Sequence, residues 1–213
     1  MKAVTAQAKI LKKEGVKFVT GFPMNLLIES LAKEDIRFIK FRTERVAVNV
    51  ADGFSRASFG ENIGVCVVQH GPGIENAFSG VAHAFADSVP VLVLPGGARR
   101  PEYAVVPDFK MKSCYREITK YVDSIDHADR TTEIMRRAFS QLRMGRPGPV
   151  VIELPLSVAN EEFEDNLFQY NPVKQVKTGG DPADIKEVVK MLLAAKSPVI
   201  RAGQGILLSL IHI

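Results

Sequence analysis

An acidic residue, Glu44, stands at the start of an apolar helical pattern in the segment FRTERVAVNVADGFSRASFG, residues 41–60. The apolar residues that follow it are spaced as in a helix packed almost all round: Ala47, Val48, Val50, Ala51 and Phe54. A carboxylate here is stabilised by the positive end of the helix dipole and can pair with Arg42 or Arg45. In a dry, fixed position the same group would form strong hydrogen bonds and suit general acid–base chemistry. This segment alone leaves both interpretations open.

A second segment, HGPGIEN at residues 70–76, combines a histidine with a Gly-Pro-Gly turn that leads into a helix. The free backbone N–H groups at the start of such a helix can hold an anion. The segment is neither a GxxxxGK[ST] phosphate loop nor a GxGxxG dinucleotide fingerprint. His70 is either a turn residue or a catalytic residue.

Alternating strands and helices must position these residues. The sequence predicts helices over residues 3–15, 25–34, from 44 onward, 74–86 and 128–144. It predicts strands in VKFVTG, IRFIKF, NIGVCVVQ, VPVLVLPGG, ITKYVDSI and GPVVIELP. The segment 97–117 has little periodicity and is predicted to be a surface excursion. Strand–helix alternation indicates an α/β fold, a doubly wound parallel sheet with helices on both faces.

Four segments follow predicted strands directly: residues 20–25, 42–45, 69–76 and 95–100. Ligands bind at the carboxyl ends of the strands in open α/β sheets. We therefore expect the four segments to meet at one edge of the sheet and to form a site there.

The composition excludes several classes of protein. The net charge of +4 comes from scattered Lys and Arg residues, so neither a nucleic-acid-binding face nor a nucleic-acid partner is expected. Cys66 and Cys114 form no metal-binding pair or disulfide framework, and they indicate a reducing cytoplasm. Lysines interrupt the N-terminus, which argues against a signal peptide, and no apolar stretch approaches the roughly 18 residues of a membrane span.

The length of 213 residues suits one domain and part of a second. We expect the first domain at residues 1–160, a linker at 161–181, and the start of a second domain at 182–207 with a capped helix and a strand. The final LSLIHI does not continue this unit, and residues 208–213 are interpreted as a non-native tail. A genuine short apolar tail is the alternative.

Taken together, RTERVAVNVADGFSRASFG, QHGPGIENAFSGVAHAFADSVPVLVLPGG and GRPGPVVIELP resemble the N-terminal, pyrimidine-binding domain of thiamine-diphosphate-dependent enzymes. The similarity is greatest to the acetolactate synthase and 2-oxo-acid decarboxylase group. It covers about residues 3–160, and residues 181–207 resemble the start of that family's central domain. In the family, a glutamate at the place of Glu44 forms a hydrogen bond with the cofactor's aminopyrimidine and so activates the cofactor. The resemblance therefore implies that Glu44 is catalytic in the decarboxylation or carboligation of a 2-oxo acid.

The resemblance assigns roles to other residues as well. Gly21 and Pro23 match a loop that approaches the pyrimidine, although Met24 replaces its usual second glycine. The residues expected to border the pyrimidine are Pro72, Gly73 and Asn76. His70 would contact the substrate carboxylate or donate a proton. Arg146 matches a position that contacts a flavin in acetolactate synthases, but an arginine ahead of a strand explains it equally well.

The chain also departs from the family pattern. Lys110, in DFKMKS, stands where acetolactate synthases usually have a glutamine, which leaves other decarboxylases, carboligases and acyltransferases open. The family's Gly-Asp-Gly metal motif is absent, so this chain is expected to supply no metal ligand and the Mg²⁺ ligands would lie in another domain. The family builds its active site between two subunits of a homodimer or tetramer, which implies that residues 1–213 alone are inactive. The alternatives are a non-catalytic binding or assembly module and, less well supported, a nucleotide-binding Rossmann protein.

Overall fold

The computed structural model describes residues 1–102, 109–175, 179–203 and 206. The predicted non-native tail, residues 208–213, lies outside the described residues. The chain divides into two compact units, Met1–Lys174 and Gln175–Ile213. Residues 161–174, which the sequence assigned to a linker, therefore belong to the first unit.

The first unit is built on a parallel sheet of six strands in the order β2-β1-β3-β4-β6-β5. The strands are β1 (Phe18–Gly21), β2 (Arg37–Lys40), β3 (Gly64–Val68), β4 (Val91–Gly97), β5 (Tyr121–Ser124) and β6 (Val150–Pro155). From β1 the chain moves outward to β2, then returns to the other side of β1 to form β3. This reversal creates a switch point between β1 and β3, where α/β proteins commonly bind ligands. The predicted doubly wound parallel sheet is confirmed.

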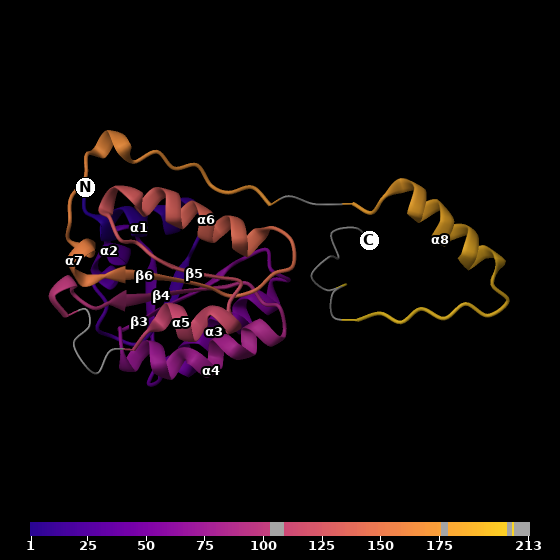
Figure 1. The fold of residues 1–213 in the computed structure, drawn as a ribbon, viewed down its shortest axis with the longest axis horizontal. Helices are drawn as coiled ribbons and strands as arrows, with labels where there is room; N and C mark the ends of the chain where they lie inside the picture. The colour runs from indigo at the N-terminus through magenta and orange to yellow at the C-terminus, as the bar shows by residue number, and fades with distance from the viewer. Residues whose placement is uncertain (103–108, 176–178, 204–205, 207–213) are drawn as a thin grey trace. The chain divides into compact units, whose positions relative to one another are not determined.

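Helices cover both faces of this sheet (Figure 1). The helices of the unit are α1 (Ala3–Lys13), α2 (Leu27–Lys33), α3 (Glu44–Ala57), α4 (Pro72–Ala86), α5 (Met111–Tyr115), α6 (Thr131–Arg143) and α7 (Leu156–Ala159), with 3₁₀ turns at Arg100–Glu102, Arg116–Ile118, Ala128–Arg130 and Asp165–Leu167. Helices α1, α2, α6 and α7 contribute to one apolar core, and α3, α4 and α5 contribute to the core on the other face. The central strands β3 and β4 are buried throughout, as their apolar sequences predict.

Helix α3 is buried on one face only, which corrects the expectation that it is packed almost all round. Ala47, Val48 and Ala51 are buried, whereas Val46 and Val50 remain partly exposed. The buried face of α3 packs against α4 and against the strands β1, β3 and β4.

The predicted surface excursion at 97–117 is also corrected, because its second half enters the core. Met111 and Tyr115 of α5 are buried, and the Tyr115 hydroxyl donates to the Ile74 carbonyl over 2.5 Å. The Tyr115 ring meets Phe78 edge to face, with 5.3 Å between ring centroids. A helix of five residues is too short to show an apolar period, so this packing has no signal in the sequence.

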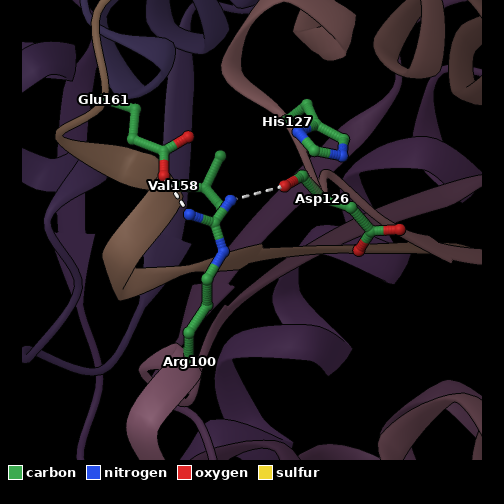
Figure 2. Close-up of a pocket in the computed structure, with 5 residues that line it drawn as sticks. All are labelled: Arg100, Asp126, His127, Val158 and Glu161. Carbon is green, nitrogen blue, oxygen red and sulfur yellow. Dashed lines mark hydrogen bonds and ion pairs between the residues drawn. The ribbon is translucent and has the colours of Figure 1, made fainter.

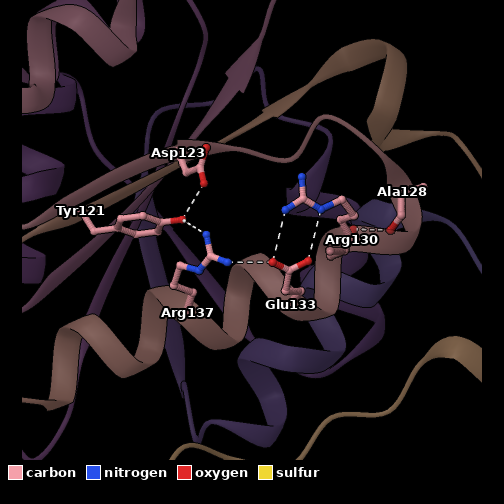
Figure 3. Close-up of polar contacts among 7 residues, drawn as sticks. Tyr121, Asp123, Ala128, Arg130, Glu133 and Arg137 are labelled. Carbon is pink, nitrogen blue, oxygen red and sulfur yellow. Dashed lines mark hydrogen bonds and ion pairs between the residues drawn. The ribbon is translucent and has the colours of Figure 1, made fainter.

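Polar contacts join the edge strand β5 to α6 (Figure 3). The Tyr121 hydroxyl donates to Asp123 Oδ2 over 2.5 Å, and Arg137 donates to Tyr121 Oη and to Glu133 Oε1. Arg130 also bonds to Glu133. Burial opposes ionisation of Asp123, but the hydrogen bonds from Tyr121 and Ser124 and the nearby Lys112 outweigh it and lower its pKa. Charged groups therefore line an edge strand that could otherwise pair with another chain.

A close approach between α3 and β3 depends on Gly64. A Cβ atom at this position would lie 2.0 Å from the Ala51 carbonyl oxygen and 2.5 Å from its carbon. We expect Gly64→Ala to lower the free energy of unfolding by about 1–3 kcal/mol, because backbone must move to accept the methyl group. Urea unfolding followed by circular dichroism measures this loss.

Gly53, in the middle of α3, provides the matched control, since a Cβ there would meet nothing within 4 Å. Gly53→Ala should raise the free energy of unfolding by about 0.5–1 kcal/mol, because alanine is the better helix former. If Gly64→Ala is as stable as the parent chain, the inference that α3 and β3 need a glycine at position 64 to approach each other is wrong.

The second unit contains α8 (Pro182–Ala194), whose start is capped by Asp181 as predicted. The Asp181 carboxylate accepts hydrogen bonds from the N–H groups of Ala183 and Asp184. The predicted strand after this helix is wrong for the described residues 195–203, which form no strand. A strand needs a neighbour to pair with, and no strand is present in the described part of this unit.

No helix in the described residues has the length and apolar character to cross a membrane.

Candidate functional site

The carboxylate of Glu44 lies buried at the first residue of α3. The residue is only 7% exposed, although it begins a helix near the carboxyl end of β2. Thr43 caps the helix by accepting a hydrogen bond from the Val46 N–H over 3.4 Å. The cap and the apolar face of α3 together fix where the carboxylate lies, and the helix dipole favours its negative charge.

The Gly-Pro-Gly bend lies against this carboxylate. A Cβ atom built on Gly73 would lie 3.6 Å from Glu44 Oε1. From the same helix, Asn76 Nδ2 donates to Glu44 Oε2 over 3.4 Å. The sequence placed Glu44, Gly73 and Asn76 in one site, and the structure brings them together.

The bend needs its glycines for two different reasons. Gly71 has φ of +59°, a left-handed conformation that favours glycine, and Pro72 follows as the first residue of α4. Gly73 is buried, and a Cβ there would come within 2.9 Å of the Gln69 Cβ. The turn therefore lets the chain pass from β3 into α4 within a few residues, and it keeps the start of α4 close to Glu44.

Asn25 joins the loop after β1 to the ends of two other strands. Its Nδ2 atom donates to the Val68 carbonyl over 2.9 Å and to the Leu94 carbonyl over 3.1 Å. Its Oδ1 atom accepts from the Leu27 N–H over 2.9 Å. No role was predicted for Asn25 from the sequence, although an asparagine just before a helix is a recognised signal of a cap.

Gly21 allows β1 and β3 to approach closely at the switch point. A Cβ on Gly21 would lie 2.3 Å from the Val67 carbonyl oxygen, so no larger residue fits without movement. The Gly21 carbonyl accepts from the Phe41 N–H over 2.9 Å, which holds the chain leading to Glu44 beside β1. Pro23 lies half-buried in the loop between Gly21 and Asn25.

His70 lies half-buried in the same region, between β3 and α4. A Cβ on Gly96, near the end of β4, would be 3.8 Å from the His70 backbone nitrogen and 4.0 Å from Asn25 Nδ2. The ends of β1, β3 and β4 therefore converge here. Together with Glu44, which follows β2, these residues form the edge predicted from the sequence.

Cys66, in the centre of β3, is part of the core. Burial raises the pKa of its thiol to about 12, and the negative charge of Glu44 adds to this effect. The thiol is therefore protonated at neutral pH and is unsuited to act as a nucleophile. Cys66 is therefore a small residue of the core.

Arg146 follows α6 and precedes β6, so it lies at the amino ends of the strands. Glu44 follows β2 and lies at their carboxyl ends. The Arg146 Nε atom donates to Ser88 Oγ over 2.7 Å, and Ser88 lies between α4 and β4. Arg146 lines a pocket of about 600 Å³ together with Phe85, Lys120 and Met144. The structure does not bring Arg146 together with the residues around Glu44.

A second hollow of about 410 Å³ lies beyond the ends of β4, β5 and β6 (Figure 2). Arg100 joins the three segments there, because it donates to Glu161 Oε1 over 2.5 Å and to the Asp126 carbonyl over 3.0 Å. Its backbone N–H donates to Ser157 Oγ. Arg100 therefore acts as a structural connection, with its guanidinium already paired.

In the part of the chain that the structure describes, no group of three or more His, Cys, Asp or Glu residues could hold a metal ion.

Comparison with known proteins connects this geometry to a family. Residues 1–126 match the family described as "Thiamine pyrophosphate enzyme, N-terminal TPP binding domain". The chain is 36% identical over 221 aligned positions to a probable acetolactate synthase large subunit of Methanocaldococcus jannaschii, covering 98% of this chain and 37% of the relative. It is 33% identical over 214 positions to a glyoxylate carboligase of Escherichia coli O157:H7, covering 97% and 36%. It is 32% identical over 206 positions to the acetolactate synthase isozyme 3 large subunit of Escherichia coli K12, covering 90% and 35%. The chain thus spans just over a third of the length of these curated relatives.

Proposed function

The chain belongs to the thiamine pyrophosphate enzyme family, and from this premise we propose that it supplies the pyrimidine-binding half of an enzyme acting on a 2-oxo acid. The reaction would be decarboxylation, carboligation or both, as in an acetolactate synthase or a related carboligase. One observation carries the proposal. The Glu44 carboxylate is buried and held beside the Gly73 bend, which supports its role as the hydrogen-bonding partner of a ring nitrogen.

The residues around Glu44 fit an aminopyrimidine. Within the described residues, the carboxylate accepts one hydrogen bond, the long contact from Asn76 to Oε2. Oε1 is therefore the oxygen available to a ligand. Since Gly73 has no side chain, the start of α4 can lie close to Oε1, which a Cβ there would approach to 3.6 Å. When bound, thiamine diphosphate supplies a carbon nucleophile and an electron sink for the carbonyl substrate.

Each residue of the site would have a distinct task. Glu44 would share a proton with N1′ of the aminopyrimidine, in a position where low solvent access strengthens the hydrogen bond. Asn76 would hold the carboxylate in one orientation. Pro72 and Gly73 would border the ring, and Gly21 and Pro23 would fix the loop that approaches it. His70 would act at the substrate, either at its carboxylate or as a proton donor.

Two further cofactors belong to this proposal. Mg²⁺ would bind the diphosphate through ligands outside the residues described here. FAD would contact Arg146, and the pocket lined by Phe85, Lys120 and Met144 supports this with cationic groups for a phosphate and apolar groups for a ring. A flavin bound there would lie at the sheet edge opposite Glu44, so its role would be separate from the chemistry at the pyrimidine.

We also propose that the site is completed by a partner subunit in a homodimer or tetramer. Val46 and Val50 of α3 and Phe78 of α4 are all more than a third exposed, although these two helices carry Glu44 and Asn76. Apolar side chains beside a buried carboxylate support a surface that another domain covers.

Residues 182–207 would begin a second domain of the same protein. The free cysteines, Cys66 and Cys114, support a reducing compartment such as the cytoplasm.

Cofactor removal tests the proposed function. The whole protein that contains this chain should lose 2-oxo-acid consumption after dialysis against EDTA and regain it only when thiamine diphosphate and Mg²⁺ return together. Residues 1–213 alone should show no measurable turnover. Consumption that survives removal of both would contradict cofactor dependence, and robust turnover by residues 1–213 alone would contradict the shared site.

A further inference from the structure

Met24 has an unusual backbone conformation and an unusual exposure. Its φ is +91°, a region that L-residues rarely adopt and that favours glycine. Its side chain is apolar, yet the residue is 71% exposed. Backbone strain of this kind persists only where the surrounding structure imposes it, and it often marks a functional position.

The loop cannot relax this strain, because both of its ends are fixed. On one side, the Gly21 carbonyl accepts from the Phe41 N–H. On the other side, Asn25 is held by the carbonyls of Val68 and Leu94 and by the Leu27 N–H. Met24 lies between these fixed points and directly precedes Asn25.

The same contacts locate Met24 at the rim of the candidate site. Phe41 lies three residues before Glu44, Val68 lies two residues before His70, and Asn25 approaches Gly96. A flexible, polarisable thioether side chain carried by this part of the loop suits contact with an apolar group of variable shape.

We propose that Met24 determines substrate specificity by contacting the substituent of the 2-oxo acid and limiting its length. This inference rests on the proposed function. A single methylene in an apolar pocket changes kcat/KM by roughly 10–200-fold, so truncation of Met24 should have a measurable effect.

The test compares kcat/KM for 2-oxo acids that carry a methyl, ethyl or propyl group, using the whole holoenzyme. The propyl-to-methyl ratio should rise by about 10-fold or more in both Met24→Gly and Met24→Ala. Met24→Gly should also raise the Tm, because glycine accepts the positive φ, whereas Met24→Ala keeps the strained conformation.

Phe59 provides a matched control, because it too is an exposed apolar residue with positive φ, +52°. It follows α3 and precedes β3, so it lies at the amino ends of the strands, away from Glu44 at their carboxyl ends. Phe59→Gly should raise the Tm and leave the ratio unchanged. If the wild-type enzyme is active but neither Met24 variant changes the ratio by more than about twofold, the inference is overturned and the proposed function stands. If the wild-type holoenzyme consumes no 2-oxo acid, the proposed function fails, and the inference fails with it.

Discussion

Glu44→Gln should lower kcat for 2-oxo-acid turnover by about 10²–10⁴-fold in the whole enzyme, the range expected when acid–base help is lost. Glutamine has nearly the same shape as glutamate, so it can keep the contact with Asn76 and the packing at the start of α3. An amide cannot exchange a proton with a ring nitrogen as a carboxyl group can. The loss should therefore appear in kcat, measured at saturating substrate and cofactor.

The same substitution should change stability only slightly. Removing the charge costs the favourable interaction with the helix dipole, about 0.3–1 kcal/mol. Glu75→Gln is the matched control, because Glu75 is also an acidic residue in the first turn of a helix but is exposed to solvent. That variant should retain wild-type kcat. A Glu44→Gln enzyme that keeps more than about a tenth of the wild-type kcat would rule out Glu44 as the group that activates the cofactor.

The second large effect is expected at Glu14, just after α1. Its side chain is fully buried and paired with Arg143 of α6. It also accepts hydrogen bonds from the Tyr170 hydroxyl and from the Val173 N–H, the latter over 3.0 Å. A single carboxylate thus joins α1, α6 and the segment that ends the first unit.

Glu14→Ala should lower the free energy of unfolding by about 3–5 kcal/mol, because it leaves the mostly buried Arg143 without its counter-charge. Two further donors, Tyr170 Oη and Val173 N, would lose their acceptor at the same time. Urea unfolding followed by circular dichroism is the suitable measurement, since the chain contains no tryptophan for fluorescence.

Glu34→Ala is the control for the Glu14 variant. Glu34 pairs with Lys9 over 3.0 Å, but both side chains are partly exposed. Loss of that pair should cost no more than about 1 kcal/mol. Equal losses for the two variants would show that the buried network contributes no more than a surface ion pair.

The sequence predicted the strands and the longer helices of the first unit because these elements have an apolar period or a continuous apolar run. It failed for α5, which is too short to show a period. It also failed for the strand expected after α8, where pairing depends on a neighbour rather than on the strand itself.

The candidate site was predictable for the same reason that the fold was. The turns HGPG and GFPM and the glutamate after IRFIKF each follow a strand, and parallel strands bring their carboxyl ends to one edge. The same rule separates Arg146 from this edge, because Arg146 precedes a strand instead of following one.

By itself, the sequence determined the parallel sheet, the edge where the four segments meet and the glutamate at the start of α3, since local patterns and chain order are enough to define them. Only the tertiary structure decided the strained conformation of Met24, the contacts of Asn25 with two strands and the buried pairing of Glu14 with Arg143. Residues 14 and 143 are far apart along the chain, and no local pattern records which distant groups will meet. Their contacts arise only when the helices pack onto the sheet and each buried polar group must find a partner.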